Sequence, residues 1–273
     1  MSLRINNNAS TWMAAHNLQD VISQSNRVQE RMTTGKKINR ASDGPAALVI
    51  GKRFEAQLAG IEQAQKNVAN SINLIDSADK SLETTEKLLI AAKQLALSSM
   101  DGTKSTEERT ANNQELTEIL ASIDRIGNNT SFGSNKLLDG TFTAKSFQVG
   151  QNAGETVTVS IGDMRGAALG VATSTVDTAA NATTALGVIE TALSSVTAER
   201  GRLGGISKNT FGAIESNLKI QAENIESARS TIMDTDYEKD SALMQQLTVR
   251  MQVASAMLGA SSQQSGLVLN LLG

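Results

Sequence analysis

Residues 58–89 read LAGIEQAQKNVANSINLIDSADKSLETTEKLL, and this stretch decides the fold class. Its main aliphatic side chains follow one another at intervals of 3, 7, 4, 3, 7 and 7 residues. Those intervals fit a repeat of about 3.5 residues, which is typical of a helix lying along another helix. Gln65, Asp79 and Glu86 interrupt the stripe. The aliphatic positions, which we expect to pack against a second long helix, are Leu58, Ile61, Val68, Ile72, Ile75, Leu82 and Leu89.

The composition permits helices of unusual length. One proline stands in 273 residues, where average usage would give about 14, and proline breaks helices. From Pro45 onward no proline interrupts the pattern up to Met100, which predicts a helix roughly 80 Å long. We expect Asp43 to cap its start. Ser105 and Glu108 then match a capping box that opens a shorter helix.

A second long helical run is predicted in the C-terminal half, where no proline occurs between residues 184 and 232. Its apolar positions average 3.5 residues apart, as in the first run. They are Phe211, Ile214, Leu218, Ala222, Ile225, Ala228 and Ile232. Two terminal helices are also expected, one over 9–34 with Gly35 as its left-handed cap and one from 237 towards 269.

The centre of the chain changes character and predicts a small β-hairpin. Phe147 and Val149 on one side, and Val157 and Val159 on the other, alternate with polar residues around the turn at 151–154. The fold class is therefore mainly α, a long antiparallel, coiled-coil-like helix bundle with a small β-hairpin insert. The out-and-back order of its elements places the two ends of the chain side by side.

Both ends of the chain are poor in charge. Arg4 is the only charged residue in 1–19, and Arg250 is the only one in 241–273. A soluble monomer gains nothing from such weakly solvated ends, so we expect them to be buried against other copies, or to remain disordered until then. The uncharged stretch 251–273 is long enough to span a bilayer, but its eight Ser, Gln and Asn residues favour an amphipathic helix that faces protein.

Composition and motifs exclude most kinds of chemistry. The net charge of −3 argues against nucleic-acid binding, and zero Cys with one His leaves no thiolate or His-rich metal site. Asp234 and Asp236 are more typical of helix caps than of a catalytic pair. No signal peptide is recognisable at the N-terminus. We expect no catalytic residue, cofactor or metal, and an enzyme is the least favoured class.

Several blocks in the same order resemble bacterial flagellin. They are residues 30–50 (ERMTTGKKINRASDGPAALVI), 130–140 (TSFGSNKLLDG), the hairpin 147–164, 227–237 (SARSTIMDTDY) and 267–273. Two details depart from the family pattern, namely Gly133-Ser134 after Phe132 and the proline at position 45. The variable outer domains of larger flagellins have no counterpart here, so the chain resembles a minimal flagellin with only the filament-core domains.

The resemblance implies a D0/D1 architecture and a structural subunit that polymerises into the flagellar filament for motility. Residues 1–42 and 236–273 would form the inner-tube domain, and 43–235 the outer core domain with its long helices and hairpin. The chain would be extracellular, exported by the flagellar type III machinery without a cleaved signal peptide. Its partners would be itself, hook-associated and cap proteins, and an export chaperone. The residues expected between subunits in the inner tube are Leu18, Val21, Ile22, Val28, Leu247, Met251, Leu258, Leu267, Leu269 and Leu272.

Many flagellins also present an arginine-rich patch to Toll-like receptor 5. The matching stretch here is 89–97, with Lys93 and Leu95, and the following helix offers Glu115. The family's first Arg corresponds to Ala91 and its Glu to Gln94, which removes charged anchors and predicts weak receptor activation.

Two other readings share part of this pattern. A hook–filament junction protein has similar terminal helices but would not form a long polymer. A coiled-coil signalling module would form a stable folded dimer, and the β-like centre and uncharged ends argue against it. The 227–237 block and the Leu-Leu-Gly end favour flagellin.

Overall fold

The structure is a computed structural model that describes the backbone of residues 9–272 and the side chains of 9, 11–261 and 263. By its internal contacts the chain divides into two compact units. Unit 1 combines Met1–Gln57 with Asn224–Gly273, and unit 2 is Leu58–Glu223.

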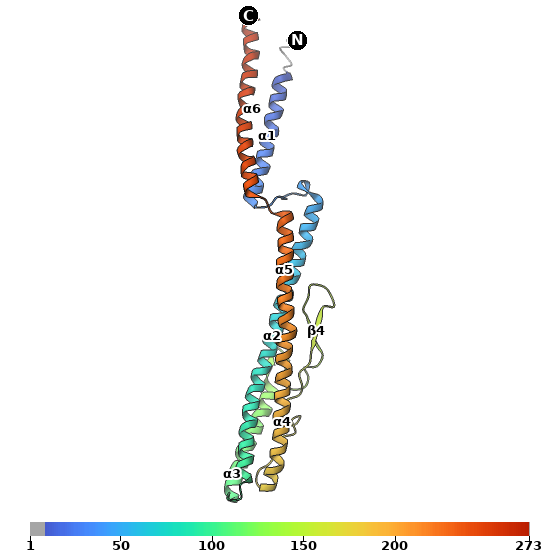
Figure 1. Cartoon of the computed structure of the whole chain (residues 1–273), viewed down its shortest axis with the longest axis vertical. Coiled ribbons are helices and arrows are strands. Elements are labelled where there is room, and N and C mark those ends of the chain that lie inside the picture. Colours follow the sequence, from blue (N-terminus) through green and yellow to red (C-terminus); the bar gives the residue numbers. More distant parts are fainter. Residues whose placement is uncertain (1–8, 273) are drawn as a thin grey trace. The chain divides into compact units, whose positions relative to one another are not determined.

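Long helices make up most of both units (Figure 1). In chain order they are α1 (Ala9–Thr34), α2 (Pro45–Met100), α3 (Thr106–Asn129), α4 (Ala179–Gly205), α5 (Gly212–Met233) and α6 (Tyr237–Leu272). A 3-10 turn covers Ala41–Asp43, and a π-helical turn, Ile206–Phe211, joins α4 to α5. The mainly α fold with a small hairpin insert is confirmed, and so are the ends of α1 and the end of α2 at Met100.

In unit 2, α2 carries an uninterrupted heptad pattern. The predicted aliphatic residues Ile61, Val68, Ile75, Leu82 and Leu89 are fully or almost fully buried, seven residues apart. A second buried row, three residues further along α2, holds small residues, which a search for large aliphatic side chains misses. These buried positions are Ala64, Ser71, Ala78, Thr85, Ala92 and Ser99. The predicted Leu58 and Ile72 are only half-buried.

The helix α3 begins as predicted and packs beside α2 (Figure 1). The Ser105 hydroxyl accepts from the Glu108 amide at 3.2 Å, and the Glu108 carboxylate accepts from the Ser105 amide at 2.9 Å. The Asn112 side chain reaches back to the hydroxyl of Ser99 on α2 at 2.9 Å. The apolar face of α3, with Leu116, Leu120 and Ile123, is buried.

The predicted hairpin is present as β3 (Lys145–Gln148) and β4 (Thr156–Val159), with Phe147 opposite Val157. Gly154 adopts φ +91° in its turn, a conformation that glycine takes without strain. The hairpin is tied to α2, since Asn67 Nδ2 donates to the Gln148 carbonyl at 3.1 Å. A second, very short ladder of β1 (Ser131–Phe132) with β2 (Asn135–Lys136) follows α3.

In unit 1, α1 and α6 run side by side (Figure 1). The chain leaves α1 through Gly35 at φ +69°, as predicted. Backbone bonds then join the two connectors, from the Lys37 amide to the Met233 carbonyl at 2.7 Å and from the Thr235 amide to the Gly35 carbonyl at 3.0 Å.

The prediction that Asp43 caps α2 was wrong. Its carboxylate accepts from the backbone amides of Asn39 and Arg40, at 3.1 and 2.8 Å, and so closes the preceding loop instead of the helix. These bonds hold the pKa of Asp43 below its ordinary value, with the Arg40 amide as the largest cause.

Candidate interaction surface of the terminal helices

The terminal helices α1 and α6 meet along a seam with alternating steps of three and four residues. That spacing is a heptad pattern, in which each helix turns one stripe towards the other. On α1 the seam holds Thr11, Ala14, Leu18, Val21, Ser25 and Val28, and on α6 it holds Met244, Leu247, Met251, Ala254, Leu258 and Ser261. Val28 and Leu247 are almost fully buried, and the Thr11 and Ser261 hydroxyls lie 2.8 Å apart.

The structure places most of the predicted inner-tube residues in this seam. Leu18, Val21, Val28, Leu247, Met251 and Leu258 face the other terminal helix of the same chain and are buried or half-buried by it. Ile22 instead points outward and is 41% exposed. The side chains of Leu267, Leu269 and Leu272 lie outside the described residues. The contact of these residues with other subunits stays a prediction.

The outer faces of the pair carry apolar side chains that the sequence analysis did not single out. Trp12, Met13, Val249, Val253 and Met257 are each more than half exposed. On α6 three of them recur at steps of four residues, next to the seam. That spacing is the signal in the sequence that could have found them. Large apolar groups exposed in a row are typical of a surface that another protein covers.

A groove of about 290 Å³ runs along this exposed row. Its walls are almost entirely apolar apart from one amide and one guanidinium side chain. The lining residues are Ala14, Asn17 and Val21 from α1, and Val249, Arg250, Val253, Ala254 and Met257 from α6. Such a groove fits apolar side chains from another helix.

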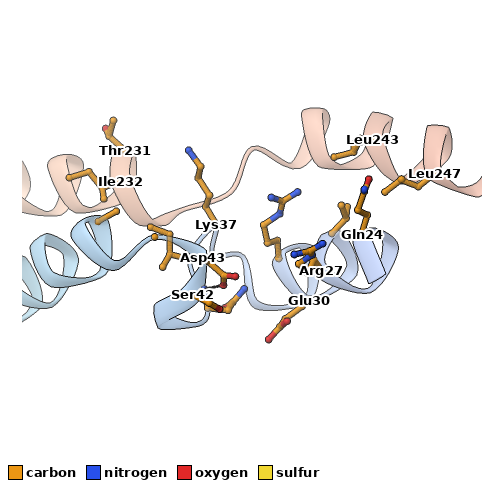
Figure 2. A pocket seen from close by; sticks show the side chains of 16 residues that line it. Gln24, Arg27, Glu30, Lys37, Ser42, Asp43, Thr231, Ile232, Leu243 and Leu247 are labelled. Atoms are coloured by element: carbon orange, nitrogen blue, oxygen red, sulfur yellow. Dashed lines mark hydrogen bonds between the residues drawn. The ribbon is translucent and has the colours of Figure 1, made fainter. Parts of the chain in front are cut away.

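A larger hollow of about 770 Å³ lies in unit 1, where α1, its following loop and the ends of α5 and α6 come together (Figure 2). Its wall alternates charged groups, among them Arg27, Glu30 and Asp43, with apolar groups such as Ile232 and Leu243. Beside it, Arg31 Nη2 bonds Asp240 Oδ1 at 2.8 Å, and the Thr235 hydroxyl donates to Asp240 Oδ2 at 2.5 Å. This arrangement locks the start of α6 onto α1.

The polar interruptions of the α2 stripe have a partner on α4. Arg200 Nε lies 2.8 Å from Asp79 Oδ1, and the same guanidinium bonds the Glu86 carboxylate. Both carboxylates raise the pKa of Arg200, the Asp79 bond most strongly. Asp79 and Glu86 therefore cross-link α2 to α4, where the sequence pattern had indicated only an imperfect stripe.

The remaining predicted site residues lie in unit 2 and are not assembled into one site. Lys93 on α2 bonds Glu190 on α4 at 2.9 Å. Leu95 is half-buried, and Glu115 is exposed on α3. Among the residues that the structure describes, no group of three or more His, Cys, Asp or Glu could hold a metal ion.

Of the two carboxylates before α6, Asp236 caps the helix as the sequence predicted. The Asp236 side chain accepts from the Lys239 amide at 3.1 Å, at the first turn of α6. Asp234 pairs its backbone with that of Lys36 in an isolated β-bridge. In the described part of the chain no helix is long and apolar enough to cross a membrane.

Comparison with known proteins identifies this architecture. The family model of the bacterial flagellin N-terminal helical region matches residues 5–143, and that of the C-terminal helical region matches residues 186–272. The chain belongs to the bacterial flagellin family. A flagellin from Halalkalibacterium halodurans is 31% identical over 98% of this chain and 99% of its own length.

Solved structures agree on the fold. Bacillus cereus flagellin matches with a TM-score of 0.50 at 24% identity, over 60% of this chain and 94% of that one. A protein assigned as a flagellar hook-associated protein from Vibrio parahaemolyticus matches with a TM-score of 0.60 at 16% identity, over 70% of this chain and all of that one. At these identities the likeness concerns the fold alone. The family is structural, and the chain is a filament subunit of the bacterial flagellum.

Proposed function

We propose that this flagellin assembles through the outer faces of its α1–α6 pair. In this proposal residues 1–42 and 236–273 form the inner tube of the filament, and residues 43–235 form the layer outside it. The seam holds the two helices of one subunit together, and the groove with its exposed rim receives the helices of neighbouring subunits. Ile22, which is 41% exposed, would add to this surface, and contact of Leu267, Leu269 and Leu272 with neighbouring subunits is part of the same proposal.

The observation that carries the proposal is the exposure of Trp12, Met13, Val249, Val253 and Met257 on the stretches 9–19 and 241–272, in which Arg250 is the only charged residue. Full burial of such a side chain stabilises a protein by about 1.5–3 kcal/mol relative to leaving it in water. Each subunit repeats the same groove and rim, so the contribution recurs along a helical polymer. Many modest contacts of this kind suffice for a stable filament.

The same surface suits the route by which the subunit would leave the cell. We expect export by the flagellar type III machinery, because an isolated pair of helices opens easily. An export chaperone would cover the apolar face before assembly. Hook-associated and cap proteins, which would share the inner-tube contacts, are the expected partners at the two ends of the filament.

We expect weak activation of Toll-like receptor 5. Ala91 and Gln94 supply no charge where many flagellins carry Arg and Glu, and the ammonium of Lys93 bonds Glu190 on the neighbouring helix. A reporter-cell response as strong as that to a standard flagellin would contradict this expectation. We also infer that the chain catalyses no reaction and takes no cofactor, in keeping with its structural family.

The test of the assembly surface uses the full chain, seeded with filament fragments at neutral pH and examined by electron microscopy. We compare the wild type with the double variant Val253→Asp, Met257→Asp, which places two charges in the groove rim. The matched control is Gln252→Asp, which places one charge on an exposed polar position of the same helix.

Long hollow filaments from the wild type and the control, with none from the double variant, are the expected result. The double variant must keep the monomer's thermal unfolding curve, which shows that unit 2 is intact. Normal filaments from the double variant would contradict the proposed surface. Short caps that never extend, from the wild type itself, would support the hook–filament junction protein, and stable dimers would support the signalling module.

A further inference from the structure

The helix that returns along α2 contains one turn of π-helix. Residues Ile206–Phe211 join α4 to α5 without a break in the helical run, and the Gly212 amide donates to the Ser207 carbonyl, five residues back. A π-turn holds one residue more than an α-helical turn, and such turns are rare and usually single. Its position therefore calls for a physical reason.

The buried positions of the return helix show that one residue is in excess. Ala182, Ile189, Val196 and Leu203 are buried at steps of seven residues in α4. Phe211 and Leu218 are again buried and seven residues apart. Leu203 and Phe211, however, lie eight residues apart. The step between the two rows is thus one residue longer than the repeat.

The facing helix α2 has no matching offset, because its buried row keeps steps of seven from Ile61 to Leu89. In a continuous α-helix one extra residue would turn Phe211 by about 100° away from the face that Leu203 occupies. The π-turn absorbs that residue, so both halves of the return helix keep the same face inward.

The structure anchors the helix on each side of the π-turn. Upstream, Arg200 bonds Asp79 and Glu86 of α2. Downstream, Phe211 is fully buried and meets the ring of Phe147 on β3 edge to face, with centroids 6.1 Å apart. Neither half can rotate to remove the extra residue without losing its anchor.

Between the anchors the backbone has little support. A Cβ added to Gly204 or Gly205 would meet no atom within 4 Å, so close packing does not require glycine there. Glycine in a helix increases the freedom of the unfolded backbone and lowers helix stability. The stretch from Gly204 to Phe211 therefore combines two glycines with a π-turn, which is a rare helical conformation.

We propose that residues 204–211 are a register joint, which here means a helical segment that accommodates the one extra residue. In this proposal the backbone hydrogen bonds of the segment break locally while the contacts of Arg200 and Phe211 on either side of it remain. Bends in long helices occur at such π-turns, so we expect this helix to bend or unfold first at the register joint. The inference concerns the subunit itself and does not rest on the assembly surface proposed above.

The test compares three variants of the full chain in the monomeric state by hydrogen exchange and thermal unfolding. Deletion of Gly205 restores the step of seven between Leu203 and Phe211. Gly205→Ala keeps the residue count and improves helix propensity alone. Deletion of Ser195, an exposed residue of α4, removes a residue where none is in excess.

In the wild type we expect the amides of 206–212 to exchange at least about tenfold faster than those of 189–196. Deletion of Gly205 abolishes that difference and leaves the melting temperature equal or higher. Gly205→Ala retains the fast exchange of the joint. Deletion of Ser195 lowers the melting temperature by about 4 °C or more, because it misaligns a buried row.

Three results would overturn the proposal. They are wild-type exchange at 206–212 as slow as at 189–196, loss of stability on deleting Gly205 as large as on deleting Ser195, or complete protection of the joint by Gly205→Ala alone. The last result would assign the local opening to glycine and not to the extra residue.

Discussion

Two pairs of antiparallel helices in this molecule use the same heptad spacing with opposite results. In unit 2, α2 packs with α4, α3 and the hairpin, and its residues Ile61, Leu82 and Leu89 have no exposed surface. In unit 1 the α1–α6 pair leaves Leu18, Met251 and Leu258 only half-buried. Two helices alone can cover only one stripe of each other, whereas in unit 2 several elements surround the buried row of α2. We therefore propose that the terminal pair is the part that a polymer completes.

The largest expected effect comes from core truncation in unit 2. Leu89→Ala removes a fully buried side chain and should lower the free energy of unfolding of the monomer by about 2–5 kcal/mol. Leu258→Ala on α6 should lower the free energy of unfolding by about 1 kcal/mol or less, because that side chain is already partly exposed to water. Urea unfolding of both variants measures the difference. Equal losses would remove the contrast between the two pairs.

A smaller effect should follow when the cross-link between α2 and α4 is broken. Arg200→Ala leaves Asp79 and Glu86 without their guanidinium, and these side chains are about three-quarters buried. We expect a loss of about 1–3 kcal/mol in the monomer's free energy of unfolding. Asp79→Asn combined with Arg200→Ala in a double-mutant cycle isolates the pair. A coupling indistinguishable from zero would show that the heptad row holds the two helices without it.

The smallest effect concerns acid. The bond from Lys104, with the Ser105 amide, lowers the pKa of Glu108 from 4.5 to about 2. A lowered pKa in the folded state means that its contribution to stability is present above pH 4.5 and is lost as the pH falls towards 2. The melting temperature of the wild type should therefore be higher than that of Glu108→Gln at pH 6, and the two melting temperatures should converge near pH 2. A difference that is unchanged down to pH 2 would contradict the role of this carboxylate.

The sequence predicted the long helices well because their ends carry local signals. Gly35, Pro45 and the Ser105 capping box act within a few residues of the chain, and each stands where it was expected. The large aliphatic residues of α2 also indicated its buried face. The small half of the same row, from Ala64 to Ser99, was missed because alanine and serine occur on both faces of helices.

Features that depend on two distant segments could not be predicted. Asp79 and Glu86 looked like defects until Arg200, more than a hundred residues later, supplied their partner. The π-turn changes the register by one residue, which an average interval of 3.5 conceals. The predicted interface residues of α1 and α6 were chosen because they are large and apolar. Most of them pack in the seam between the two helices of the same chain. The exposed row from Val249 to Met257 lies beside that seam.

The most direct measurement is hydrogen exchange of α1 and α6 in the monomer and in assembled filaments, with α2 as the internal reference. If a polymer completes the terminal pair, the amides of 9–34 and 237–261 should exchange rapidly in the monomer and slow by at least about a hundredfold in filaments. The amides around Leu82 and Leu89 should be slow in both states. Terminal helices that are as well protected in the monomer as α2 would contradict the account.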